Sequence, residues 1–351
     1  MSLKSGSLCM AVPALACAIG VLALCPQSLA QDDNPMGLPP RTAPPPVSVQ
    51  PETPREPEPA SPAITPSPND DSRFVFRKQV QEVVLHATVV DEMGHLVTNL
   101  DRNAFSIFQN GQPEAVISFR KEDVPVAIGI VIDNSGSMRD KRAKVNEAVL
   151  NLIRASNPQD EVFVVNFSQT PYLDQDFTSD VKLLQTALER TSSRGSTALY
   201  DAVVASAVHL RNNPRLEKKV LLVITDGEDN MSRETLADAM RQLQSNKGAT
   251  LYAIGLSDER NLGMTRSSRQ ALQALAFSSG GVAFFPESLE EVGSITRTIA
   301  HDIRSQYTLA YNPGGTGGKG YQTIRVEAHG PAHTRLTVRT RSGYYPGETM
   351  R

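Results

Sequence analysis

The chain has 351 residues, which is long enough for a sizeable core and for more than one module. Its net charge is −3, and acidic and basic residues are interspersed, so nothing indicates the clustered Lys and Arg of a nucleic-acid surface. Trp is absent and aromatic residues make up only 5%, which argues against an aromatic carbohydrate-binding platform.

Residues 1–30 have the pattern of a secretory signal peptide. Lys4 supplies the positive charge, an apolar stretch follows, and small residues allow cleavage after Ala30. The apolar stretch is shorter than the roughly 20 residues that span a bilayer. We therefore predict a secreted or periplasmic protein with no stable membrane span after cleavage. All three cysteines lie in this segment, so the mature chain offers neither a disulfide nor thiol chemistry.

Residues 31–72 are rich in Pro, Ser, Thr and Glu and contain almost no large apolar residues. Such a segment cannot bury enough surface to fold, and its prolines favour an extended polyproline II conformation. Fully extended, it could reach on the order of 100 Å. We predict a disordered linker, which serves either as a tether that holds the folded part at a distance or as an inert leader.

Residues 123–305 alternate between strand-like and helix-like patterns, which predicts one α/β domain. Continuous apolar runs suit strands that are covered on both faces. These runs are residues 124–132, 162–167, 220–225, 251–256 and 282–285. Between them lie helical patterns, of which residues 289–303 form a clear amphipathic example. We expect a doubly wound, mostly parallel sheet with an antiparallel edge strand at residues 172–177.

The two flanks of this domain have alternating apolar residues, which indicates β-strands. Residues 73–122 carry a hairpin signal at Asn110-Gly111, and residues 306–346 alternate on both sides of a Gly-rich loop. Neither flank is long enough for a good sandwich alone. We therefore predict that the two flanks pair with each other in one small β module, followed by a short tail at residues 347–351.

The most informative motif is Asp133-Asn134-Ser135-Gly136-Ser137, directly after the run 124–132. Hard divalent cations prefer such oxygen donors, and open α/β sheets bind ligands at the carboxyl ends of their strands. Two further loops add Thr197, before a helical segment, and Asp226, after the run 220–225. Each residue alone has a simpler explanation, since Ser and Thr cap helices and Asp-Gly forms turns. Three such loops at one sheet edge favour a metal site.

At these residues the sequence resembles the von Willebrand factor type A domains. Asp133, Ser135 and Ser137 match the D-x-S-x-S motif of that family, Thr197 matches its loop threonine, and Asp226 matches its T-D-G aspartate. The resemblance covers about residues 124–305 and implies that the five residues form a metal-ion-dependent adhesion site (MIDAS). The flanking strands resemble a bacterial secreted subgroup, whose members wrap the domain in strands before and after it.

The resemblance implies a Mg²⁺ ion, with Mn²⁺ or Ca²⁺ as alternatives. Ser135, Ser137 and Thr197 would coordinate through their hydroxyls, and Asp133 and Asp226 directly or through water. An open position on the ion would then accept a Glu or Asp carboxylate from a partner protein, which implies metal-dependent protein–protein interaction or adhesion. In relatives the threonine is the ligand most often made or broken between affinity states. The amphipathic segment is the element expected to shift, with plain packing on the sheet as the alternative.

Two other functions remain open. One is a structural envelope scaffold whose metal only rigidifies the fold. The other is a phosphatase with Asp133 as nucleophile, although Ser135 stands where such enzymes place a second Asp.

The sequence shows no other catalytic motif that we recognise. The six His are scattered without the spacing of zinc ligands, and no G-x-S-x-G nucleophile elbow occurs. Residues 314–320 lack the Ser or Thr that follows Lys in a phosphate loop, so we expect a flexible hairpin loop there. We predict that the protein is not an enzyme.

Acidic residues directly after Asp226 admit two explanations. Glu228 and Asp229 could strengthen the attraction of a cation, but a solvated loop or a helix cap explains them more simply.

Overall fold

The computed structural model describes residues 82–121, 123–190, 193–213, 215–256, 264–314, 320–330 and 336–347. The predicted signal peptide (1–30) and linker (31–72) lie outside these ranges, as does most of the tail at residues 347–351. Within the described ranges, no helix is long and apolar enough to cross a membrane.

A six-stranded sheet lies at the centre of the α/β domain, in the order β10-β9-β8-β5-β6-β7. Its strands are β5 (Val126–Asp133), β6 (Glu161–Phe167), β7 (Pro171–Thr178), β8 (Lys218–Thr225), β9 (Thr250–Gly255) and β10 (Ala283–Phe284). Every neighbouring pair is parallel except β6 and β7, which are antiparallel. The predicted mostly parallel sheet and its antiparallel edge strand are therefore confirmed.

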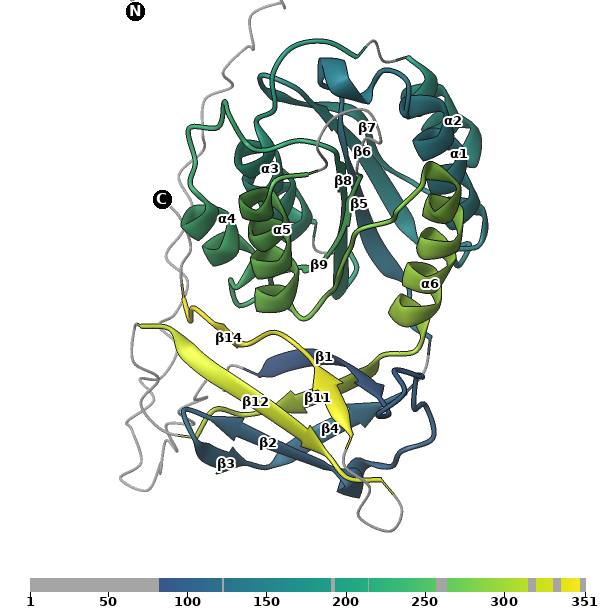
Figure 1. Cartoon of the computed structure of the whole chain (residues 1–351). Coiled ribbons are helices and arrows are strands. Elements are labelled where there is room, and N and C mark those ends of the chain that lie inside the picture. Colours follow the sequence, from purple (N-terminus) through teal and green to yellow (C-terminus); the bar gives the residue numbers. More distant parts are fainter. Residues whose placement is uncertain are drawn as a thin grey trace, which may run out of the picture. The chain divides into compact units, whose positions relative to one another are not determined.

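Helices cover both faces of this sheet (Figure 1). They are α1 (Arg142–Arg154), α2 (Val181–Glu189), α3 (Leu199–Asn212), α4 (Leu236–Leu243), α5 (Arg266–Ser279) and α6 (Val292–Arg304). Apolar residues of α1, α2 and α6 pack in one core cluster, and those of α3, α4 and α5 pack in a second. The predicted doubly wound arrangement is therefore present, and α6 follows a short 3-10 turn at Leu289–Glu291 within the predicted amphipathic segment.

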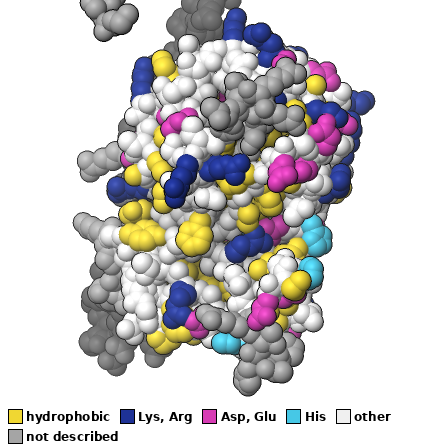
Figure 2. Space-filling view, in the orientation of Figure 1, with side chains coloured by type: hydrophobic (Ala, Val, Ile, Leu, Met, Phe, Trp, Pro, Cys, Tyr) yellow, Lys and Arg dark blue, Asp and Glu magenta, His cyan; other side chains and the backbone are white. Residues whose placement is uncertain are grey.

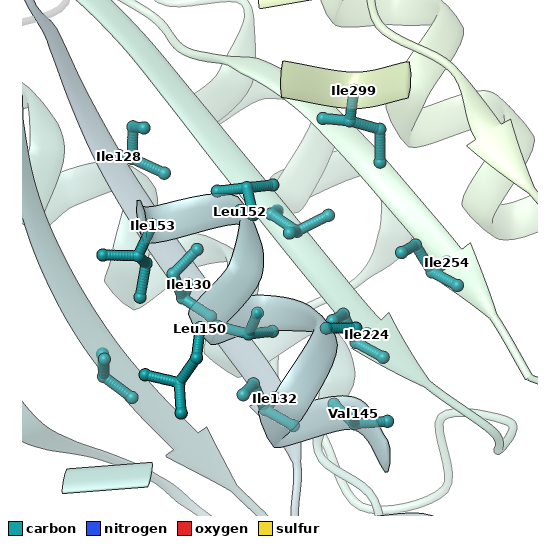
Figure 3. Close-up of a cluster of buried hydrophobic side chains, with 14 of the residues drawn as sticks. Ile128, Ile130, Ile132, Val145, Leu150, Leu152, Ile153, Ile224, Ile254 and Ile299 are labelled. Atoms are coloured by element: carbon teal, nitrogen blue, oxygen red, sulfur yellow. The ribbon is translucent and has the colours of Figure 1, made fainter. Parts of the chain in front are cut away.

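The central strand β5 is buried along its whole length because its side chains enter both cores. Ile128, Ile130 and Ile132 point into the cluster shown in Figure 3, where they meet helix residues such as Val145 and Ile299. Alternate residues of the same strand belong to the opposite cluster. Successive side chains of a strand point to opposite faces, so a continuous apolar run is what a strand between two helical layers requires.

Strands from both flanks form two antiparallel four-stranded sheets, β13-β1-β11-β4 and β14-β12-β2-β3. The first flank supplies β1 (Val83–Val90), β2 (Phe105–Gln109), β3 (Gln112–Glu114) and β4 (Val116–Arg120). The second supplies β11 (Tyr307–Tyr311), β12 (Gln322–Ala328), β13 (Thr337–Arg339) and β14 (Gly343–Tyr344). A shared apolar core joins the two sheets. The prediction that the flanks pair with each other is confirmed.

The two turn predictions in the flanks have different outcomes. Asn110 and Gly111 have φ values of 51° and 79° and connect β2 to its antiparallel partner β3, as a hairpin of this type requires. The Gly-rich segment at residues 314–320 does not close a hairpin, because the strands on either side of it, β11 and β12, lie in different sheets. Local turn composition indicates a reversal of the chain, but it does not reveal which strands will pair. Residues 315–319 of this segment lie outside the described residues.

A buried polar network joins the β module to the α/β domain at α6. Asp302 accepts hydrogen bonds from Thr88 of β1 at 2.7 Å and from Arg339 of β13 at 3.0 Å. Gln306, at the start of the second flank, donates to the Tyr252 hydroxyl of β9 at 3.2 Å. Buried polar groups of this kind fix one geometry, because any displacement would leave them unpaired. The chain therefore leaves α6 in a defined direction as it enters β11.

Gly129 of β5 has almost no space for a side chain. A Cβ atom there would lie 2.5 Å from Leu221 Cδ2 and closer still to the ring of Phe163. We predict that Gly129→Ala lowers the free energy of unfolding by about 1–3 kcal/mol through overpacking. Urea denaturation checks this, with Gly320→Ala as the matched control. A Cβ at Gly320 meets no atom within 4 Å, so this variant should stay within about 0.5 kcal/mol of wild type. Equal effects of the two changes would contradict the tight packing at Gly129.

Candidate metal centre

The two candidate carboxylates emerge side by side at one edge of the sheet. Asp133 is the last residue of β5, and Asp226 directly follows β8. The two strands are parallel neighbours, with Ile132 opposite Ile224. Parallel pairing places the carboxyl ends of both strands at the same edge, where open α/β sheets bind their ligands.

Asp133 is fully buried and held in place through both carboxylate oxygens. Its Oδ1 accepts the Ser135 amide at 2.8 Å, and its Oδ2 accepts the Thr225 hydroxyl at 2.6 Å. Burial raises the pKa of Asp133 above its usual range, and repulsion from Asp226 acts in the same direction, whereas the hydrogen bonds from Thr225 and Ser135 lower it. A nearby cation would therefore favour the ionised form of this buried carboxylate.

Two hydroxyls of the first loop lie between the carboxylates. Ser135 Oγ is 3.1 Å from Ser137 Oγ, and Ser137 donates to Asp226 Oδ1 at 2.8 Å. Ser135 occupies the N-cap position of a short 3-10 turn, but its side chain makes no capping hydrogen bond. The side chain of Ser135 therefore does not cap this turn. The side chains face the carboxylates instead.

Thr197 reaches the same point from the loop before α3. Its amide donates to Asn230 Oδ1 at 3.0 Å, and its carbonyl accepts the Asn230 amide at 3.0 Å, so the loop after β8 holds it. A Cβ placed on Gly227 would lie 3.2 Å from Thr197 Oγ1 and 3.9 Å from Asp133 Oδ2. The glycine thus allows all three loops to approach closely. Thr197 does not cap α3 either, since Ala198 holds that N-cap position.

Lys141 belongs to this centre, although the sequence reasoning missed it. Its ammonium forms an ion pair with Asp226 Oδ2 and lies 3.4 Å from the Ser137 carbonyl oxygen. Both side chains of the pair are buried, at 8% exposed for the lysine and 2% for the aspartate. Its position four residues after Ser137, immediately before α1, was a signal available in the sequence. Thr225, which orients Asp133, was also missed as a functional residue.

The donor set fits a small hard divalent cation. Among the described residues, no group of three or more His, Cys, Asp or Glu side chains lies together, so a metal here depends on hydroxyl ligands as well. The five predicted residues do converge, and they offer two carboxylates and three hydroxyls, all of them oxygen donors. The Lys141 ammonium shows that Asp226 already attracts a positive charge at this point.

Of the two acidic residues after Asp226, Asp229 caps a helix, and Glu228 binds side-chain hydroxyls at the start of another. Asp229 Oδ1 accepts the amide of Leu199 at 2.8 Å at the N-terminus of α3. Glu228 accepts the hydroxyls of Thr265 at 3.2 Å and Ser267 at 2.8 Å, at the start of α5. The loop after β8 is thereby fixed between two helix termini, which fixes Asp226 as well.

Comparison with known proteins agrees with this geometry. The sequence profile described as the von Willebrand factor type A domain matches residues 128–228, a span that contains all five candidate ligands and Lys141. Domains of this family are generally interaction modules rather than enzymes. No curated protein matches the chain in sequence.

Several solved structures are similar to this chain in fold. A von Willebrand factor type A protein from Catenulispora acidiphila is 15% identical, with 75% of this chain and 73% of that chain covered and a TM-score of 0.43. BatB from Bacteroides thetaiotaomicron is 18% identical, covering 50% and 98% of the two chains, with a TM-score of 0.41.

A third similar structure is proximal thread matrix protein 1 of the mussel byssus, with zinc in its MIDAS motif. It is 17% identical over 56% of this chain and has a TM-score of 0.45, and the match spans about half the length of the mussel protein. The profile match shows that residues 128–228 are similar to the von Willebrand factor type A domain, and the doubly wound sheet observed around them is consistent with that similarity.

Proposed function

We propose that the protein mediates divalent-metal-dependent protein–protein interaction or adhesion, through a metal ion held by Asp133, Ser135, Ser137, Thr197 and Asp226. The observation that carries this proposal is the convergence of those five oxygen-bearing side chains from three loops at one edge of the sheet. Mg²⁺ is the ion we expect first, with Mn²⁺ and Ca²⁺ as alternatives, because the donors are hydroxyls and carboxylates.

Charge balance favours a site that binds an acidic partner. Only two of the five donors carry a negative charge, and Lys141 already pairs with one of them, so the site with a divalent ion bound would not carry an excess of negative charge. Such an ion, when bound, supplies an electrophilic position that attracts a further carboxylate. The chain itself orients that position, because hydrogen bonds fix Asp133, and hydrogen bonds with the side chain and the backbone amide of Asn230 fix Thr197. We therefore propose a protein partner that presents Glu or Asp.

Binding explains the site better than catalysis does. Both oxygens of Asp133 accept hydrogen bonds and the residue is fully buried, which suits an orienting ligand rather than a nucleophile. The remaining alternative is a structural envelope scaffold whose metal only rigidifies the loops. The proposed setting is secreted or periplasmic, on the strength of the signal-like residues 1–30.

Metal binding should stabilise the folded protein. At a Mg²⁺ concentration about 100-fold above Kd, mass action adds about 2.7 kcal/mol, or roughly 5–10 °C in the unfolding midpoint. Calorimetry in Mg²⁺ and in EDTA measures the difference. Ser137→Ala removes one exposed hydroxyl ligand and should abolish most of the shift, whereas Asp140→Ala removes an exposed carboxylate on the same loop and should retain it. A Mg²⁺ shift that survives in Ser137→Ala would place the ion elsewhere.

Lys141 should oppose the incoming metal. Its ammonium pairs with Asp226, so a cation bound to the same carboxylate must overcome that repulsion. We expect Lys141→Met to raise Mg²⁺ affinity about tenfold, which corresponds to about 1.4 kcal/mol. Titration calorimetry measures the affinity, and Lys144→Met, an exposed lysine of α1, serves as the control. Weaker binding in Lys141→Met would instead assign the lysine to the support of the metal site.

Partner capture tests the proposed interaction. The mature protein is used to capture partners from an envelope or culture fraction, in Mg²⁺ and in EDTA, with Asp133→Ala and Asp140→Ala in parallel. We expect partners that are lost in EDTA and in Asp133→Ala but retained in Asp140→Ala. Captured partners insensitive to both changes would support the scaffold instead, and phosphate release from a model ester would support the phosphatase.

Thr197 tests whether affinity for such a partner depends on the hydroxyl from the second loop. We predict that Thr197→Ala weakens partner binding by tenfold or more, since an oxygen ligand of the ion is lost. Surface plasmon resonance with a captured partner measures the change. Unchanged affinity would argue against a switch at this ligand.

A further inference from the structure

A cavity of about 430 Å³ lies at the edge of the six-stranded sheet opposite the metal centre, where the strands begin. Its walls come from the start of β8 and β9, the end of α3, the turn before β9, and β1 and residues 340–341 of the β module. Ligand pockets of about 300–1,000 Å³ commonly form where two structural layers meet. The site is therefore separate from the five candidate metal ligands.

Four cations line this cavity without an acidic partner among the described residues. They are Arg211 of α3, Lys219 of β8, Lys247 of the turn before β9, and Arg341 after β13. Each reaches the cavity from a different element, so together they surround it rather than form one basic stripe. On the face visible in Figure 2, basic and acidic side chains are interspersed, which is the usual pattern of a soluble surface. The cavity differs from that pattern because its four cations have no acidic partner among the described residues.

The other charges of the cavity leave this excess in place. Arg215 forms an ion pair with Glu161 at 2.9 Å, and Glu217 forms one with Arg120 at 3.3 Å. Glu82, the remaining carboxylate of the lining, is exposed to solvent, where it is screened. The lining is thus positively charged overall.

Arg341 is a buried cation whose position in the cavity wall is fixed by hydrogen bonds. It is only 8% exposed, and its guanidinium donates to the carbonyl oxygens of Ser245, Asn246 and Val84 at 3.3, 3.0 and 2.9 Å. These neutral carbonyls fix its position but do not neutralise its charge. Its Nε and the neighbouring Thr340 Oγ1 are buried without a hydrogen-bond partner. Two polar atoms of the lining residues therefore lie in the wall of the cavity without a hydrogen-bond partner.

Lys219 is a second buried cation of the cavity wall. It is 5% exposed and donates to the Arg211 carbonyl oxygen at 3.4 Å, near the end of α3. Burial lowers its pKa to about 8, and repulsion from Lys247 and Arg211 acts in the same direction. Positive charges that repel one another at a buried position would be stabilised by an anion between them.

We propose that this cavity binds a compact oxyanion of the phosphate class, either inorganic phosphate or a phosphate monoester. Guanidinium and ammonium groups that line one cavity from several elements match the distributed oxygens of a tetrahedral anion, whereas a single carboxylate is satisfied by one guanidinium fork. The lining holds more uncompensated positive charge than a monoanion would neutralise. The ligand bridges the α/β domain and the β module.

Isothermal titration of the full chain with inorganic phosphate tests the proposal. The buffer contains EDTA and chloride at matched ionic strength, so that neither the metal centre nor general screening contributes. We expect one saturable site, and affinity reduced tenfold or more in Lys247→Gln and in Arg211→Gln. Lys182→Gln, an exposed lysine of α2, and Ser137→Ala at the metal centre should bind as wild type does.

Lys247 is exposed and Arg211 is partly exposed, so neither substitution opens the core, and circular dichroism confirms folding. Absence of saturable phosphate binding would overturn the proposal. Equal affinity in both cavity variants and in Lys182→Gln would also overturn it. Tighter binding of the dicarboxylate malonate than of phosphate would refute the assignment to the phosphate class.

Discussion

The burial of Asp133 at the end of the central strand β5 is the constraint on which the loops at the carboxyl edge of the sheet depend. A carboxylate without solvent must find hydrogen-bond donors or a positive charge. Ser135 and Thr225 supply the donors, and they must therefore stand in fixed places at the ends of adjacent strands. The same requirement brings Asp226 close, which adds negative charge that Lys141 partly offsets. A divalent ion at this point would complete the balance.

The two ends of the sheet carry different groups of functional side chains for a structural reason. Parallel strands end together at one edge and begin together at the other, so the connecting loops gather into two separate groups. The loops after the strands collect carboxylates and hydroxyls, and the N-termini of α3 and α5 hold Asp229 and Glu228 beside them. The opposite edge collects cations, one of which, Lys219, lies at the carbonyl end of α3, where the helix dipole favours positive charge.

The β module also depends on the α/β domain for its position. Strand β11 follows α6 almost directly, and Asp302 near the end of that helix binds Thr88 and Arg339 from two different strands of the module. Removing such a buried partner would leave several polar groups unpaired, at a cost of about 1–3 kcal/mol each. The module lies at the sheet edge where the strands begin, whereas the candidate metal ligands lie at the opposite edge (Figure 1).

Much of this protein could be predicted from local pattern. Continuous apolar runs indicated strands that are buried on both faces, and Asn110-Gly111 indicated a hairpin, because burial and backbone conformation act within a few residues. The spacing of Asp133, Ser135 and Ser137 indicated a site because one loop supplies all three. Pairing between the flanks was predictable in kind, since neither could bury its apolar face alone. The strand order within the two small sheets was not.

Other features were decided only by tertiary structure. Lys141 is a lysine before a helix in the sequence, and only folding places its ammonium on Asp226. Ser135 and Thr197 could have capped helices through their side chains, and only their geometry excludes that. The cationic cavity combines residues from α3, β8 and the β module that are distant in sequence. The sequence by itself determined which residues can form strands, helices and oxygen ligands, because those preferences are local. Which charges meet was decided by the packing of distant segments, because electrostatic interactions act through space rather than along the chain.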